Sequence, residues 1–193
     1  MFTGIVQAVG RIVRPNPLEI DAGPLDLSRV ALGDSICVQG VCLTVSAMRG
    51  RGFTADVSAE TLRVTTGLDR PGAVNLEKSL ALGDKLGGHL VTGHVDGVGE
   101  VTSRNGSVFR FRLPGAITRY VAIKGSICVD GVSLTVNQLV RDEFEVNLIP
   151  HTLKVTTLAR LEPGSKVNLE VDLVARYVAR LLEASNHVPT NGG

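Results

Sequence analysis

The sequence predicts an all-β protein made of two small tandem barrels that are followed by one helix. Three observations lead to this prediction. One block of the chain occurs twice, the apolar runs inside each copy are short and rich in Val, Ile and Thr, and only the region after the second copy has helical periodicity. Because a barrel closes its own sheet edges, each copy can fold as a barrel by itself.

The duplication is clearest in a block of eleven residues. Residues 35–45 read SICVQGVCLTV and residues 126–136 read SICVDGVSLTV, which gives nine identities at an offset of 91. Further matches place the first copy at residues 1–86 and the second at residues 87–172. Gly, Pro, Asn and Asp separate the apolar runs, as expected for strands joined by turns.

A single amphipathic helix is expected over residues 173–184. Apolar residues recur at helical spacing from Leu173 to Leu182, and Asp172 stands at the N-cap position. No similar segment follows the first copy, so we expect the apolar stripe to pack against other subunits. Residues 185–193 are polar and rich in helix breakers, and we expect a mobile tail without a function.

The composition excludes several classes of function. The 193 residues are 44% hydrophobic and 20% charged, the net charge is +1, and only 4% are aromatic. Neither an electrostatic nor a stacking surface for nucleic acid is therefore expected. The chain has no signal-peptide pattern and no apolar run near the ~20 residues that span a bilayer, so we expect a cytoplasmic protein without a membrane partner.

Two small polar pairs mark the candidate site. Alternate residues of a strand share a face, so Cys42 and Thr44 point to one side of the first barrel and Leu43 to the other. Ser133 and Thr135 take the corresponding face in the second copy. The two copies thus present a thiol or a hydroxyl at the same place, as expected for similar ligands that are handled differently.

The three cysteines have neither disulfide nor zinc-site spacing, and we expect reduced thiols and no metal. Cys37 and Cys128 are identical in the two copies, and a packing role is sufficient for them. Cys42 is open to two interpretations, a small buried hydrophobic residue or a thiol that faces the ligand.

His94 replaces Ile5 of the first copy and follows Gly93, where the backbone can be approached closely. It is either a general acid or base or a half-exposed histidine with an ordinary hydrogen bond. His89 precedes it by five residues, which places the two on opposite faces of a regular strand, so a shared metal ion is not expected.

Two charged residues also distinguish the second copy. Asp172 stands opposite Ser79, and Lys124 stands opposite Gly33. An Asp before a helix can simply cap it, and a Lys in a turn can simply be solvated. The alternative is that both groups orient a polar ligand.

Four motifs together resemble riboflavin synthase of the alpha-chain type: MFTGIV at 1–6, GVCLTV at 40–45, GGHLVTGH at 87–94 and DGVSLTV at 130–136. The resemblance extends from Met1 to about Glu183. It implies two six-stranded antiparallel Greek-key barrels and a homotrimer held by the C-terminal helices. The implied reaction converts two molecules of 6,7-dimethyl-8-ribityllumazine into riboflavin and 5-amino-6-ribitylamino-uracil, without a cofactor or a metal.

The resemblance also implies the site residues. In this family each site lies where the N-terminal barrel of one subunit faces the C-terminal barrel of another. The implied first pocket contains Gly4, Val6, Cys42, Thr44, Ser58 and Thr61. The implied second pocket contains Lys124, Ser133, Thr135, Ile149 and Thr152, with His94 reaching the shared space. The remaining expected substrate-binding residues are Ile5, Leu43, Asp56, Val57, Ala59, Glu60, Gly93, Val95, Leu134, Pro150, His151, Leu153 and Lys154.

The implied chemistry is loss of a proton from the 7-methyl group of one molecule and addition at C7 of the other. The resemblance assigns proton transfer to His94 and Ser133, placement of the reaction partner to Cys42 and Thr44, and polar orientation to Asp172 and Lys124. Covalent attack by the thiol is not implied.

His151 stands where other members carry Glu as well as His, so its role is left open. Two other functions are considered. A lumazine-binding antenna protein shares the duplicated fold without turnover, but such proteins tend to lose the polar residues that are kept here. An oligonucleotide-binding barrel is disfavoured by the near-neutral charge and the scarcity of aromatic residues.

Overall fold

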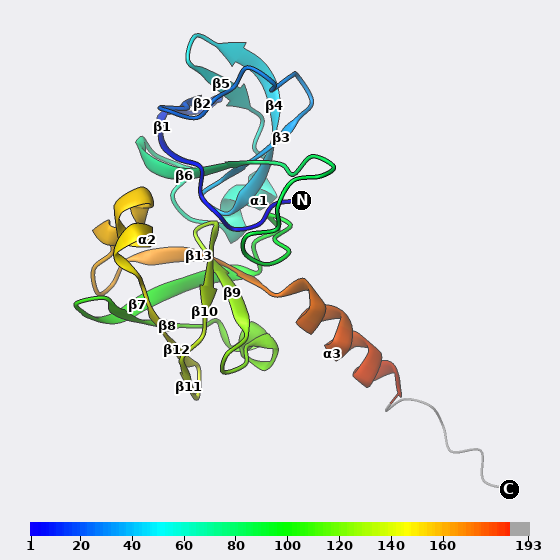
Figure 1. The fold of residues 1–193 in the computed structure, drawn as a ribbon, viewed down its shortest axis with the longest axis vertical. Coiled ribbons are helices and arrows are strands. Elements are labelled where there is room, and N and C mark those ends of the chain that lie inside the picture. The colour runs from blue at the N-terminus through cyan, green and yellow to red at the C-terminus, as the bar shows by residue number, and fades with distance from the viewer. Residues whose placement is uncertain (186–193) are drawn as a thin grey trace, which may run out of the picture.

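The computed structural model describes residues 1–185 and gives each copy of the repeat its own antiparallel sheet (Figure 1). In the first copy, six strands close into a barrel in the order β1-β2-β5-β4-β3-β6. Its elements are β1 (Ala8–Pro15), β2 (Leu18–Asp21), β3 (Ser35–Val38), β4 (Val41–Arg49), β5 (Gly52–Ala55), α1 (Ala59–Val64) and β6 (Gly72–Lys78).

The second copy repeats this strand order with one interruption. Its sheet runs β10-β9-β13-β7-β8-β12-β11, and the strands at its two ends are the halves of the strand that corresponds to β4. Only Val136 and Asn137 separate these halves, and Val136 is the equivalent of Val45, where β4 has an irregular register. The elements are β7 (Gly97–Asn105), β8 (Val108–Arg112), η1 (Gly115–Tyr120), β9 (Ser126–Val129), β10 (Val132–Thr135), β11 (Gln138–Val140), β12 (Glu143–Asn147), α2 (Pro150–Val155), η2 (Thr157–Arg160) and β13 (Lys166–Val171).

The predicted all-β architecture is confirmed, and so are the predicted faces of the strands. Each barrel has its own hydrophobic core. In β4 the side chain of Leu43 is buried in the first core, whereas Cys42 is half-buried and Thr44 is exposed on the outer face. In β10, Ser133 and Thr135 have the same pattern. The alternation of the strand therefore directs both polar pairs outward.

The two barrels meet through a nearly symmetric network of buried amides. The Nδ2 of Asn75 donates to the backbone carbonyl of Asp130, and the Nδ2 of Asn168 donates to that of Gln39, both at 2.9 Å. Each amide oxygen also accepts a backbone N–H of the other copy at 2.8 Å. Because every one of these buried groups is satisfied, the network fixes how the copies lie on each other.

Asp130 introduces an ionisable group into this network, where the first copy has Gln39. Its side chain is buried, and its Oδ2 has no hydrogen-bond partner in the described part of the chain. Burial raises the pKa of this carboxyl from 3.8 to about 7. Near neutral pH the fold therefore holds a proton that the unfolded chain releases.

We expect Asp130→Asn to weaken the pH dependence of stability. The raised pKa of Asp130 stabilises the fold. This stabilisation is fully present below pH 3.8, the pKa of the carboxyl in the unfolded chain, and is lost as the pH rises to about 7. The neutral amide does not titrate, so the free energy of unfolding of the variant should fall less over this range. Urea unfolding at about pH 5 and about pH 8 measures the difference, and an equal change in both proteins would contradict it.

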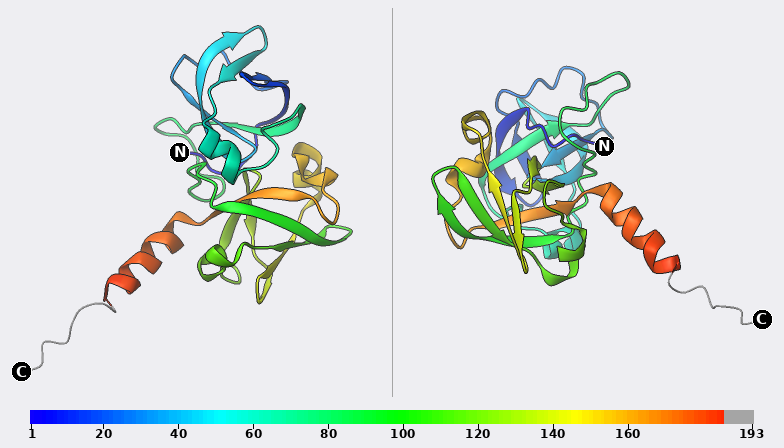
Figure 2. Two further views of the ribbon diagram at one scale, coloured as in Figure 1. Left: turned by 180° about the vertical axis from the view of Figure 1, so that it is seen from behind. Right: turned by 60° about the horizontal axis from the view of Figure 1, so that its bottom comes forward.

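Helix α3 (Leu173–Ser185) extends away from both barrels (Figures 1 and 2). Asp172 caps it, because its Oδ1 accepts the backbone N–H of Val174 at 2.9 Å. An ion pair between Arg176 and Asp96 at 2.6 Å holds the first turn against the second barrel. The predicted helix and its cap are confirmed, and its exposed apolar residues include Val174, Tyr177, Val178, Leu181 and Leu182.

No helix in residues 1–185 is long and apolar enough to cross a membrane. Of the tail expected at residues 185–193, only Ser185 lies within the described residues, as the last residue of α3.

Candidate functional site

The first residues of each copy lie on the barrel of the other copy. The backbone N–H of Ser133 donates to the carbonyl of Gly4, and the backbone N–H of Cys42 donates to the carbonyl of Gly93, both at 2.8 Å. Each outward polar pair is therefore completed by a backbone segment from the opposite copy. We call residues 3–6 and 92–95 the crossing segments.

Within one chain, this crossing separates residues that the resemblance groups in one pocket. The resemblance places Gly4 and Val6 with Cys42, but Gly4 contacts Ser133 and Val6 packs against the core of the second barrel. Conversely, Val95 packs against the core of the first barrel. Matching by offset could not reveal this exchange, because it pairs residues by their place in each copy and not by their contacts.

Glycine is required at the point where each crossing segment touches the other barrel. Gly4 has φ +73° and Gly93 has φ +78°, a region that other residues rarely adopt. A Cβ on Gly4 would lie 2.6 Å from the backbone nitrogen of Ser133, and a Cβ on Gly93 would lie 2.6 Å from the Cβ of Cys42. The close approach leaves no room for a side chain.

Ser133 is paired with a histidine that the sequence analysis did not place in the site. The Nδ1 of His89 lies 2.7 Å from the Oγ of Ser133, and the His89 side chain is buried. Burial lowers the pKa of the imidazole from 6.5, while the nearby charge of Asp172 opposes the shift. Near neutral pH the hydroxyl therefore contacts a neutral imidazole, which can take a proton from it.

His94 lies apart from this pair. It is exposed, and its crossing segment is held by Cys42 of the first barrel. The resemblance has His94 reach the space shared by two subunits, and within one chain its crossing segment lies beside the first barrel. The alternation used to separate His89 from His94 assumed a regular strand, but the segment between them has only an isolated bridge from Val91 to Phe2.

Several expected binding residues have their side chains elsewhere. Leu43 and Leu134 are buried in the two cores, so only their backbone could contact a ligand. The hydroxyl of Ser58 caps α1 by accepting the N–H of Thr61 at 3.0 Å, whereas Ile149 stands at the N-cap position of α2 and makes no side-chain cap. The remaining expected residues lie on or beside these two helices. The exposed ones are Asp56, Ala59, Glu60, Pro150, His151 and Lys154, and the partly buried ones are Val57, Thr152 and Leu153.

The cysteines divide as expected. Cys37 and Cys128 are buried between the barrels against Phe2 and Val91, and burial raises the pKa of both thiols well above 9.0. The packing role predicted for them is confirmed. Cys42 lies at the edge of this cluster, where its half-buried side chain still faces outward with Thr44.

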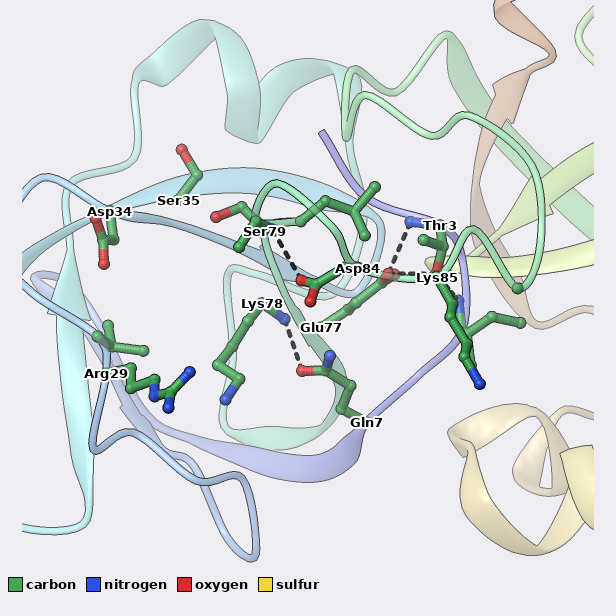
Figure 3. A pocket seen from close by; sticks show the side chains of 15 residues that line it. Thr3, Gln7, Arg29, Asp34, Ser35, Glu77, Lys78, Ser79, Asp84 and Lys85 are labelled. Atoms are coloured by element: carbon green, nitrogen blue, oxygen red, sulfur yellow. Dashed lines mark hydrogen bonds between the residues drawn. The ribbon is translucent and has the colours of Figure 1, made fainter.

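A cavity of about 710 Å³ lies on the first barrel, and neither Cys42 nor Thr44 lines it (Figure 3). Its wall includes Ser35, which pairs with Thr44 across β3 and β4, and Glu77 of β6. Ile5 is the one expected binding residue among those that line it. Ser35 does not stand out when the two copies are compared for differences, because the equivalent residue of the second copy, Ser126, is also a serine. No group of three or more metal-ligating side chains occurs in the described residues.

Comparisons with known proteins match both copies of the repeat. A model of the lumazine binding domain matches residues 3–79 and 92–172, one match for each copy. The riboflavin synthase of Mycobacterium tuberculosis is 50% identical over 201 residues, which cover 96% of this chain and 100% of the relative. The riboflavin synthase of Bacillus subtilis is 39% identical over 202 residues, with 98% and 94% covered.

The chain belongs to the riboflavin synthase family. Solved structures of LumP are also similar. LumP complexed with 6,7-dimethyl-8-(1'-D-ribityl) lumazine has a TM-score of 0.76 at 26% identity, and LumP complexed with riboflavin has a TM-score of 0.78 at 28% identity. Each comparison covers 89% of this chain and 99% of LumP.

Lys124 is a strained position in this riboflavin synthase family member. It is exposed with φ +65°, whereas its equivalent in the first copy is Gly33 with φ +89°. A residue with a Cβ in this region costs about 1–3 kcal/mol. The backbone N–H of Lys124 donates to the carbonyl of Val136, the residue after Thr135, at 2.7 Å.

We expect Lys124→Gly to leave stability unchanged or higher while the Michaelis constant for the lumazine substrate rises several-fold. Glycine relieves the strain, and the lost ammonium removes a polar contact. Steady-state kinetics and urea unfolding measure both effects. Arg141→Gly is the matched control, because Arg141 has φ +55° in a turn outside the expected site. An unchanged Michaelis constant in Lys124→Gly would remove Lys124 from the site.

Proposed function

We propose that this chain catalyses the dismutation of 6,7-dimethyl-8-ribityllumazine. Two molecules react, one transfers a four-carbon unit to the other, and the products are riboflavin and 5-amino-6-ribitylamino-uracil. Two substrates and two products balance in atoms and electrons, so the proposal includes no oxidant, cofactor or metal. The observation that carries it is the outward polar pair on each barrel of a chain that matches a riboflavin synthase over 96% of its length, with the Nδ1 of His89 2.7 Å from the Oγ of Ser133.

The Ser133–His89 pair is the proposed acceptor of the 7-methyl proton. In the tautomer that carries its hydrogen on Nε2, the imidazole Nδ1 takes the hydroxyl proton while the Ser133 oxygen takes the proton from carbon. The carbanion then adds to C7 of the second molecule, which Cys42 and Thr44 place on the first barrel. Holding both molecules in fixed positions supplies a large part of the rate.

We propose that the complete site forms between subunits. Cys42 and His94 lie on the first barrel, and the Ser133–His89 pair lies on the second. A homotrimer in which the first barrel of one subunit faces the second barrel of another would join them. The exposed apolar stripe of α3 supports this assembly, because so much exposed apolar surface marks an interaction site. Within this assembly Asp172 and Lys124 orient the ligand.

Removing α3 is expected to abolish the trimer. A chain that ends after Asp172 should sediment as a monomer and lose most of its turnover, because neither barrel then meets its partner. A chain that ends after Ser185 keeps the helix and is the matched control. A truncated chain that stays trimeric would disprove the role of α3 in assembly.

The proposed domain division is residues 1–86, 87–172 and 173–184. We also propose a cytoplasmic location, which the three free cysteines support because reducing compartments keep thiols unpaired.

Incubation of the purified protein with 6,7-dimethyl-8-ribityllumazine alone tests the proposed activity. Absorbance and chromatography should show riboflavin accumulating as the lumazine is consumed. The likeness to LumP supports one other function, a lumazine-binding protein without turnover. Stable binding without riboflavin formation would favour that function and contradict the enzyme.

A further inference from the structure

A buried glutamate in each barrel holds the backbone of a crossing segment. In the first barrel, the Oε1 of Glu77 accepts the N–H and the hydroxyl of Thr3 at 2.7 and 2.6 Å, and its Oε2 accepts the N–H of Gly4 at 2.9 Å. Figure 3 shows Glu77 directed at Thr3 from β6. The carboxylate thus fixes two successive peptide groups.

Glu170 of the second barrel repeats this arrangement. Its Oε1 accepts the N–H and the hydroxyl of Thr92 at 2.6 and 2.7 Å, and its Oε2 accepts the N–H of Gly93 at 2.9 Å. Both glutamates are 3% exposed. Burial raises the pKa of both carboxyls, and the hydrogen bonds from Thr and Gly oppose the shift.

The segment that each glutamate holds serves the other barrel. Glu77 holds the N–H of Gly4, and the carbonyl of the same residue accepts the backbone N–H of Ser133 of the second barrel. Glu170 holds the N–H of Gly93, and the carbonyl of that residue accepts the backbone N–H of Cys42 of the first barrel. Each carboxylate therefore lies in one barrel and sets the geometry beside the polar pair of the other.

We propose that Glu77 and Glu170 are crossed positioning residues, with Glu77 shaping the ligand site of the second barrel and Glu170 that of the first. This inference rests on the proposed function, because it takes the two polar pairs as the ligand sites. A carboxylate suits the task because both of its oxygens accept hydrogen bonds and neither donates. A glutamine would turn an N–H₂ group toward one of the backbone donors.

The test is a titration of ¹⁵N-labelled full-length protein with riboflavin. Riboflavin is not consumed during the titration, because no second reactant is present. The amide signals of residues 42–44 report the first barrel, and those of residues 133–135 report the second. In Glu77→Gln the dissociation constant read at residues 133–135 should rise about tenfold, because a charge-assisted hydrogen bond is lost, while that read at residues 42–44 stays unchanged. Glu170→Gln should give the reverse pattern.

The two variants are matched controls for each other. If each one weakens only its own barrel, or both sites equally, the crossed assignment is wrong. Thr3→Val and Thr92→Val remove only the hydroxyl donor to each carboxylate, and they should show the same crossed pattern more weakly if either Gln variant fails to fold. If the two polar pairs are not ligand sites, the result is different, because riboflavin would then move neither set of signals in the unmodified protein.

Discussion

Replacing Ser133 with alanine is expected to lower kcat by about a hundredfold to ten-thousandfold, while the dissociation constant of the lumazine substrate changes little. The Ser133 hydroxyl is the group through which the neutral imidazole of His89 reaches the substrate proton. Its loss removes proton transfer, but it leaves the surrounding backbone contacts in place. Pre-steady-state binding and steady-state turnover separate the two quantities.

His89→Ala should have a similar effect, and the double variant should be no slower than either single variant, because the two side chains act as one unit. His94→Ala is also expected to slow turnover more than it weakens binding. Independent, additive effects of Ser133→Ala and His89→Ala would contradict the pair.

The same pair sets an expectation for the pH profile. The pKa of His89 is lowered from 6.5 by burial, so the imidazole stays neutral down to below that pH. We expect kcat to hold steady from neutral pH to pH 6.5 and to fall only under more acidic conditions. A decline that begins above pH 7 would assign proton transfer to a different group.

Gly93→Ala is expected to destabilise the fold by about 3 kcal/mol and to weaken ligand binding on the first barrel. The new methyl group would meet the Cβ of Cys42 at 2.6 Å in a backbone region that alanine disfavours. The crossing segment must therefore move away from Cys42. Urea unfolding and riboflavin binding measure the two effects.

Gly164→Ala separates the steric overlap from the backbone strain. Gly164 also has a positive φ, of +91°, but a Cβ there would meet no atom within 4 Å. The Gly164→Ala variant should therefore lose stability through backbone strain alone and should retain ligand binding. If Gly93→Ala behaves like Gly164→Ala in both measurements, the close approach of Gly93 to Cys42 does not matter for the site.

Much of the fold follows from local sequence. The repeat at offset 91 predicts two homologous barrels, and strand alternation correctly directs Cys42 and Thr44 outward because one face of a barrel strand always meets the core. The break of the second copy between β10 and β11 has no such signal, because residues 132–136 closely match the first copy.

The site was less predictable, because its assembly depends on long-range contacts. Gly4 and Gly93 occupy equivalent places in the two copies, and nothing in either motif indicates that each contacts the opposite barrel. His89 was considered only as a possible metal ligand beside His94, and its contact with Ser133 joins residues 44 positions apart in the chain. Two signals were nevertheless available: the paired Thr-Gly steps at residues 3–4 and 92–93, and the buried Glu that ends the matched block at residues 77 and 170.

The central claim is that two unequal barrels handle the same molecule in different roles. The most direct test is a chromatographic count of reactant and products after incubation with 6,7-dimethyl-8-ribityllumazine, for the unmodified protein and for Ser133→Ala. We expect one riboflavin and one 5-amino-6-ribitylamino-uracil for every two lumazine molecules consumed, and bound but largely unreacted lumazine in the variant. Lumazine that stays intact in the unmodified protein, or equal product formation by Ser133→Ala, would contradict it.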